Sequence, residues 1–168
     1  MGTVEWIFVA EQGGQPMRPV DEARAVAGRG LDGDRYATRR GYWTDVDECQ
    51  VTLIAAEDLD AITGVAVDGG QHRRNIVTRG VDLRALAGRA FRVGEATFAF
   101  DRPRPPCRYI EGLTEPGMTR ALAARRGGIC ARVVESGVIR PGDRIELLAA
   151  DAAATPPAPG PVHRAPNR

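Results

Sequence analysis

Short apolar segments separated by turn residues dominate the first 150 positions of the chain. Strands are predicted where apolar residues alternate or run together, at residues 4–9, 51–54, 75–78, 129–134 and 144–148. Residues 91–93 and 96–100 also alternate on either side of Gly94 and Glu95, which predicts a β-hairpin. Many short strands with frequent turns are typical of a barrel or a sandwich.

Two helices are predicted between these strands. Residues 56–62 form the first, and residues 116–126 the second, which has a proline in its first turn and Met118 and Leu122 four positions apart. Gly127 and Gly128 follow directly and predict its end. The predicted fold class is therefore mainly β with short helices.

The chain divides into one folded unit and a tail. Residues 151–168 consist mostly of proline, alanine and polar residues, so they offer little apolar surface to bury, and we expect this tail to be disordered. Residues 1–150 are expected to fold as one domain, because 43% of the 168 residues are hydrophobic and can supply a core.

The net charge and the N-terminal sequence indicate which partners and which cell compartment to expect. A net charge of +1 argues against a nucleic-acid-binding or membrane-surface protein. The sequence contains no apolar run of about 18 residues, so no membrane-spanning helix is predicted. The first ten residues contain Glu5 and lack a basic lead, unlike a signal peptide. We therefore expect a cytoplasmic protein whose oligomeric state the sequence leaves open.

The cysteines and histidines limit the possible sites. Cys49, Cys107 and Cys130 are too widely spaced to predict a disulfide framework or a zinc site, and Cys130 is expected in the core of a strand. His72 is the single histidine of residues 1–150, which gives little support to a histidine-based catalytic triad.

Cys107 has the surroundings of a reactive thiol. Pro105 and Pro106 stiffen the backbone before it, and Arg104 and Arg108 flank it. Nearby cations favour the thiolate, which is both a nucleophile and a ligand for soft metals. The alternative is a half-buried structural cysteine at the end of a strand.

A second group of polar residues opens the strand at 75–78. Strand alternation would place Arg73 and Asn75 on one face and Arg74 on the other. An arginine fork and an asparagine amide could together bind an anionic ligand that is rich in heteroatoms. The alternative is a solvated strand end. Arg35, in a glycine-rich turn, could add another anion contact or simply pair with Asp34.

The motifs also occur in a familiar order. They are Gly-Leu-Asp-Gly-Asp-Arg-Tyr at 30–36, Val-Thr-Leu-Ile-x-x-Glu at 51–57, Arg-Arg-Asn-Ile-Val-Thr-Arg-Gly-Val-Asp-Leu at 73–83, Leu-x-Gly-x-x-Phe-x-Val-Gly-Glu-Ala at 86–96, Pro-Cys at 106–107, Gly-Gly at 127–128, Gly-Val-Ile at 137–139 and Gly-Asp at 142–143. This order resembles the MOSC family, named after the C-terminal domain of molybdenum-cofactor sulfurases, over about residues 4–148.

The resemblance implies a β-barrel-like fold, similar to the barrel of pyruvate kinase, with a central cleft. It implies that Cys107 carries sulfur as a persulfide or ligates molybdenum, and that Arg73 and Asn75 contact the pterin of the molybdenum cofactor (molybdopterin). It further implies that Arg35 belongs to the same pocket, and Arg108 is counted with the cofactor-binding residues. Pyridoxal phosphate is not expected here, because the sulfurase domain that binds it has no room in 168 residues.

Three functions follow from these expectations. The first is a cofactor-binding protein that carries sulfur or handles the cofactor, with a molybdoenzyme or a sulfur donor as its partner. The second is a molybdenum-dependent reductase of N-hydroxylated compounds that receives electrons from a separate protein. The third is an interaction module without a cofactor.

Overall fold

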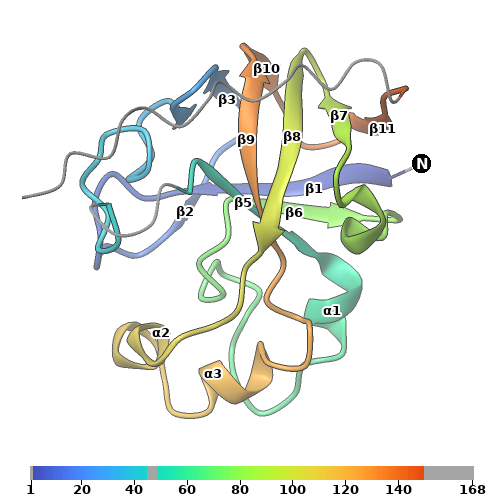
Figure 1. Cartoon of the computed structure of the whole chain (residues 1–168). Helices are drawn as coiled ribbons and strands as arrows, with labels where there is room; N and C mark the ends of the chain where they lie inside the picture. Colours follow the sequence, from blue (N-terminus) through green and yellow to red (C-terminus); the bar gives the residue numbers. More distant parts are fainter. Residues whose placement is uncertain (1, 45–48, 150–168) are drawn as a thin grey trace, which may run out of the picture.

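Seven strands close into a barrel in the computed structural model, which describes residues 2–44 and 49–149. In barrel order they are β11 (Arg144–Leu147), β7 (Ala90–Val93), β8 (Ala96–Pro103), β9 (Ile129–Glu135), β5 (Val51–Ala55), β6 (Ile76–Arg79) and β1 (Gly2–Val9). Pairing of Gly2 with Ile145 joins β1 to β11 and closes the barrel. Neighbouring strands are antiparallel except for β5 and β6. The predicted fold class is confirmed (Figure 1).

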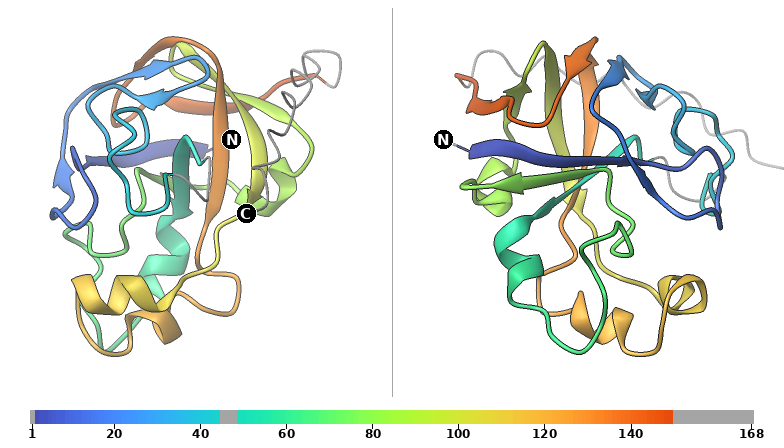
Figure 2. Two further views of the ribbon diagram at one scale, coloured as in Figure 1. Left: turned by 60° about the vertical axis from the view of Figure 1, so that its left-hand side comes forward. Right: turned by 180° about the vertical axis from the view of Figure 1, so that it is seen from behind.

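Smaller elements surround the barrel. A second sheet contains β10 (Gly137–Ile139), β3 (Ala23–Val26) and β4 (Gly30–Leu31), and β2 (Arg18–Pro19) pairs with the end of β1. The helical elements are α1 (Ala56–Asp60), the 3-10 helix η1 (Leu83–Leu86), α2 (Arg108–Leu113) and α3 (Met118–Ala121). Figures 1 and 2 show α1, α2 and α3 gathered at one end of the barrel. Within the described ranges no helix is long and apolar enough to cross a bilayer.

Two apolar clusters hold these elements together. The larger one fills the barrel, where the rings of Phe91 and Phe98 stack with centroids 5.8 Å apart. The smaller one lies under the helices and includes Ile54, Met118 and Leu122, all fully buried. Burial of side chains of this size stabilises the fold by roughly 1.5–3 kcal/mol each. The helical end, which carries the site described below, therefore has a core of its own.

The predicted strands and the hairpin at 94–95 are present, whereas the predicted helix at 116–126 is mostly absent. Only Met118–Ala121 is helical. Ala124 and Arg125 have φ angles of 54° and 72°, so the backbone leaves the right-handed helical region well before Gly127. The spacing of Met118 and Leu122 did identify a buried face. The predicted tail, residues 151–168, lies outside the described residues.

Asn75 lies directly before β6 and joins this strand to two others. Its side-chain oxygen accepts hydrogen bonds from the backbone N–H and the hydroxyl of Thr52, at 3.1 and 3.0 Å. Its amide nitrogen donates to the Phe8 carbonyl at 3.1 Å. The side chain is fully buried. The Asn75 side chain therefore binds β5 through its oxygen and β1 through its amide nitrogen.

Gly128 allows β9 to pass close to β5. Its φ is +82°, and a Cβ atom built there would lie 2.0 Å from the Leu53 carbonyl oxygen. A backbone oxygen cannot move aside as a flexible side chain can. Gly64 provides a matched comparison, because its φ is +83° and a Cβ atom there would meet nothing within 4 Å.

We expect Gly128→Ala to destabilise the protein far more than Gly64→Ala. Both variants incur the cost of a left-handed residue with a side chain, about 1–2 kcal/mol. Gly128→Ala must also displace backbone, which adds about 1–3 kcal/mol. Urea denaturation measures both unfolding free energies, and equal losses would show that the close approach of β5 and β9 is not a constraint.

Asn75→Ala should lower the unfolding free energy by at least about 2 kcal/mol, because it leaves buried groups of Thr52 and Phe8 without partners. Thr52→Val in the same background should then cost less than it does alone, since the two side chains share hydrogen bonds. Denaturation of the two single variants and the double variant measures this coupling. A loss under about 0.5 kcal/mol for Asn75→Ala would contradict the structural role.

Candidate functional site

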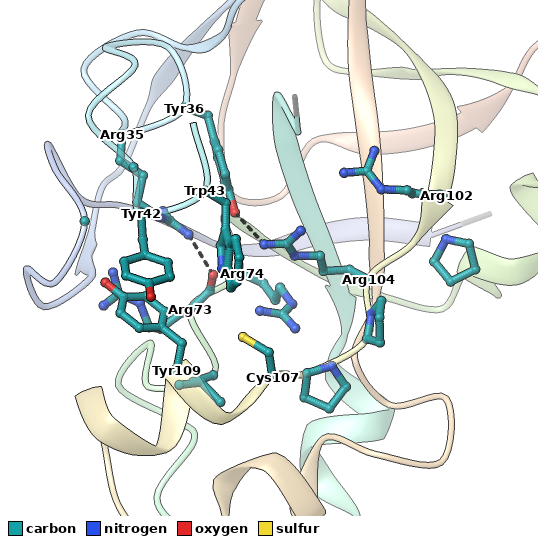
Figure 3. A pocket seen from close by; sticks show the side chains of 16 residues that line it. Arg35, Tyr36, Tyr42, Trp43, Arg73, Arg74, Arg102, Arg104, Cys107 and Tyr109 are labelled. Atoms are coloured by element: carbon teal, nitrogen blue, oxygen red, sulfur yellow. Dashed lines mark hydrogen bonds between the residues drawn. The ribbon is translucent and has the colours of Figure 1, made fainter. Parts of the chain in front are cut away.

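Cys107 is positioned by a proline-stiffened loop and by the start of a helix. The loop follows β8, and Cys107 is the residue before α2 (Arg108–Leu113). Its carbonyl accepts hydrogen bonds from the Ile110 N–H at 3.1 Å and from the Thr119 hydroxyl at 3.2 Å. Its side chain is half-buried, and Figure 3 shows the sulfur pointing into a cavity. Both α2 and α3 therefore hold the backbone of this residue.

Arg73 and Arg74 reach the same cavity through an unusual backbone turn. Arg73 has a φ of 59°, and β6 starts only at Ile76. Strand alternation therefore does not apply here. The expected grouping, with Arg73 and Asn75 on one face and Arg74 on the other, differs from the cavity lining, which contains both arginines but not Asn75. Both arginines line the cavity that contains Cys107.

The guanidinium of Arg74 is fully paired except at one nitrogen. Its Nε donates to the Gly127 carbonyl at 2.7 Å, and its Nη1 donates to the His72 carbonyl at 3.2 Å. Its Nη2 has no hydrogen-bond partner among residues 2–44 and 49–149. Burial lowers the pKa of Arg74 to about 10, so the side chain still carries its charge at neutral pH. A buried cation is thus held with one donor left over.

His72 fixes the turn before Arg74 without adding charge. Its Nδ1 accepts a hydrogen bond from the Arg74 backbone N–H at 2.9 Å, and its ring meets Phe8 edge-on with centroids 5.4 Å apart. Burial, together with the neighbouring Arg74, lowers the pKa of His72 to about 3. The imidazole is therefore neutral and orients the backbone.

Arg35 ties the glycine-rich turn to the arginine pair. Its Nη1 donates to Asp34 at 3.1 Å, and its Nη2 donates to the Arg73 carbonyl at 3.0 Å. Asp34 is fully buried and also accepts the Ala10 N–H at 3.1 Å. Arg35 thus pairs with Asp34 and also lines the cavity, and its contact with an anion stays a prediction.

The cavity is strongly cationic. Its volume is about 540 Å³, and five arginines line it, namely Arg35, Arg73, Arg74, Arg102 and Arg104. Among the described residues no aspartate or glutamate lines it, although Asp34 and Asp101 pair with Arg35 and Arg102 from outside the lining. Arg104 also donates to the Tyr36 hydroxyl at 3.5 Å. The cavity is therefore suited to an anion.

Aromatic rings form one side of the cavity. Tyr42 stacks on Tyr109 with centroids 3.9 Å apart and an interplanar angle of 16°, and Tyr42 meets Trp43 edge-on at 4.8 Å. Figure 3 shows Tyr42 and Tyr109 beside Arg73, across the view from Arg102 and Arg104. Tyr109 comes from α2, whereas Tyr42 and Trp43 come from the segment between β4 and β5. The stack therefore connects two parts of the chain that are distant in sequence.

The structure brings together three of the five predicted site residues. Cys107, Arg73 and Arg35 line one cavity. Asn75 lies in the barrel wall, outside the lining, and Arg108 is exposed at the start of α2. The alternation rule misplaced Arg74. Tyr42 and Tyr109 lacked a local signal, because what pairs them is a tertiary contact.

The comparisons with known proteins agree with this architecture. A search of curated proteins finds no match. The YuaD protein of Bacillus subtilis superposes with a TM-score of 0.69 at 17% identity, over 88% of this chain and 96% of that one. YiiM of Geobacillus stearothermophilus gives a TM-score of 0.65 at 16% identity, over 91% and 78% of the two chains. YiiM of Escherichia coli gives 0.57 at 18% identity, over 86% and 69%. At such identities these likenesses show a shared fold.

A family match carries the assignment further. The family model of the MOSC domain matches residues 40–146. This span includes the cavity residues Arg73, Arg74 and Cys107 and most of β11, the last strand of the barrel. This chain belongs to the MOSC domain family.

Proposed function

We propose that this protein binds the molybdenum cofactor and handles it or its sulfur through Cys107. The supporting observation is Arg74, a buried cation with one unpaired donor among the described residues, which lines the same cavity as the half-buried Cys107. A ligand that brings an anionic group and a soft metal would use both features. The family match is consistent with this ligand.

The cavity fits the chemistry of such a cofactor. Molybdopterin carries a phosphate, and an arginine fork binds phosphate oxygens in two places. Arg74 Nη2 is unpaired in the described part of the chain, and Arg73 donates through Nη1 to the Gln15 carbonyl at 2.7 Å, which steadies its guanidinium. A volume of about 540 Å³ lies within the usual range for cofactor sites.

Cys107 would supply the sulfur. A thiolate is a ligand that suits a soft metal, and a cysteine persulfide can pass its outer sulfur to an acceptor. The cofactor, when bound, supplies oxygen-atom and electron-transfer chemistry at molybdenum. The protein's own contribution is to hold the ligand between the arginines and the sulfur. Free thiols are consistent with work in a reducing cytoplasm beside a molybdoenzyme or a sulfur donor.

The aromatic side of the cavity favours a second candidate function, the reduction of N-hydroxylated compounds with electrons from a separate protein. The stacked rings of Tyr42 and Tyr109 offer a flat apolar surface beside the arginines. A planar substrate could lie against such a surface. Both candidates require the cofactor, and they differ in whether bound molybdenum turns over a substrate.

Cys107→Ser should abolish retention of molybdenum. We expect wild-type protein purified from a host that makes the cofactor to contain molybdenum and pterin. The serine variant should lose the metal, because an alcohol is a far poorer ligand for a soft metal. Elemental analysis measures the metal, and fluorescence of the released, oxidised pterin measures the organic part. Equal, near-zero contents in both proteins would contradict the proposal.

Arg74→Lys should weaken phosphate binding at least about tenfold. Lysine keeps the charge but lacks the planar fork, and a hydrogen bond to a charged group contributes about 1.5–3 kcal/mol. Arg108→Lys is the matched control, because Arg108 is exposed and lies outside the cavity. Calorimetric titration with inorganic phosphate at constant ionic strength measures the three affinities. Loss of affinity in the Arg108 variant alone would place the anion site elsewhere.

A further inference from the structure

A second pair of sulfur atoms lies outside the Cys107 cavity. The Cys49 thiol donates a hydrogen bond to the Cys130 sulfur across 2.8 Å. The two residues are 81 positions apart in sequence, and both side chains are buried. Neither lines the Cys107 cavity. The proposed cofactor function makes no use of them.

The barrel fixes both backbones around this pair. Cys130 is in β9, where it pairs with Thr52 of β5 and with Arg102 of β8. Cys49 precedes β5 by two residues, and its sulfur lies 3.6 Å from the Val51 carbonyl oxygen. Because β5 and β9 are neighbours in a closed barrel, the two sulfurs are held together by the fold.

Positive charge near the pair favours an ionised sulfur. The hydrogen bond from Cys49 lowers the pKa of Cys130, and Arg104 and Arg102 lower it further against the effect of burial. The same hydrogen bond and burial raise the pKa of Cys49. Cys49 therefore keeps its proton and donates it toward the Cys130 sulfur. A pair of neighbouring cysteines with one sulfur favoured in the thiolate form is readily oxidised.

An oxidant can approach the pair through a second cavity. Cys49 lines a cavity of about 280 Å³ together with Tyr36, Ala37, Gln50 and others. Tyr36 also lines the Cys107 cavity, so this residue borders both cavities. A small uncharged oxidant that enters here meets Cys49 first, because Cys130 does not line this cavity.

We propose that Cys49 and Cys130 are a modification site, at which hydrogen peroxide oxidises the two thiols to one disulfide. The Cys49 proton passes to the Cys130 sulfur, and the Cys49 sulfur attacks a peroxide oxygen. The O–O bond breaks, which leaves a sulfenic acid on Cys49 and releases hydroxide, and this hydroxide takes up a proton from solvent to become water. The Cys130 sulfur then attacks the Cys49 sulfur and displaces hydroxide, which leaves as water with the Cys130 thiol proton. Two electrons pass from the two sulfurs to the peroxide, and the two oxygens of the peroxide end as two waters.

The disulfide would link the start of β5 to β9 and stabilise the barrel. Cross-linking residues 81 positions apart restricts the unfolded chain, and for a protein of this size we expect Tm to rise by about 5–15 °C. This inference does not depend on the cofactor, so it stands or falls separately from the proposed function.

Peptide mapping of the peroxide-treated protein tests the proposal. The full chain is exposed to hydrogen peroxide, its remaining thiols are alkylated, and it is digested with trypsin without reduction. Cleavage after arginine yields peptides 41–73, 93–108 and 127–132, with one cysteine in each. The expected product links 41–73 to 127–132, and thiol reduction should remove both the link and the rise in Tm.

Two controls separate the fold's effect from general thiol reactivity. Cys107→Ser should form the same link at the same rate, because Cys107 takes no part. Oxidation in guanidinium chloride should abolish the preference for this pair. A link to peptide 93–108 in the native protein, free thiols on Cys49 and Cys130 after treatment, or sulfinic acids there without a link would each overturn the proposal.

Discussion

The site depends on one constraint, the buried guanidinium of Arg74, which has no carboxylate partner in the described part of the chain. Moving an isolated charge out of water costs several kcal/mol unless hydrogen bonds or an opposite charge compensate. The carbonyls of Gly127 and His72 satisfy part of Arg74, and its Nη2 is buried without a partner among the described residues. Arg74 lines a cavity that four other arginines also line. The cavity therefore carries positive charge that is only partly compensated, and an anionic ligand would supply the missing compensation.

The rest of the local structure maintains that arrangement. Gly127 presents its carbonyl to Arg74, and a Cβ atom on this residue would lie 2.1 Å from the Arg104 carbonyl oxygen. Neutral His72 holds the turn before Arg74, and Arg35 holds the turn at Arg73. The backbone carbonyl of Cys107 is held by hydrogen bonds from α2 and α3. These contacts thus position either a cation or the sulfur.

The sequence predicted the barrel strands well and singled out Cys107, which the structure places in the cavity lining, because both have strong local signals. Alternation and turn residues mark strands such as β7 and β8, and Pro105, Pro106 and flanking arginines mark Cys107. The alternation rule failed at Arg74, since the φ of 59° at Arg73 breaks the strand geometry on which it rests. Tertiary pairs such as Tyr42 with Tyr109, or Cys49 with Cys130, depend on long-range packing and left no local pattern.

The central claim is that one cavity places molybdenum beside Cys107 and an anionic group beside Arg74. A crystal structure of protein purified with bound cofactor, with anomalous diffraction data collected at the molybdenum absorption edge, tests this directly. The account predicts an anomalous peak within bonding distance of the Cys107 sulfur and phosphate density at Arg74 Nη2. A molybdenum peak outside this cavity would contradict it.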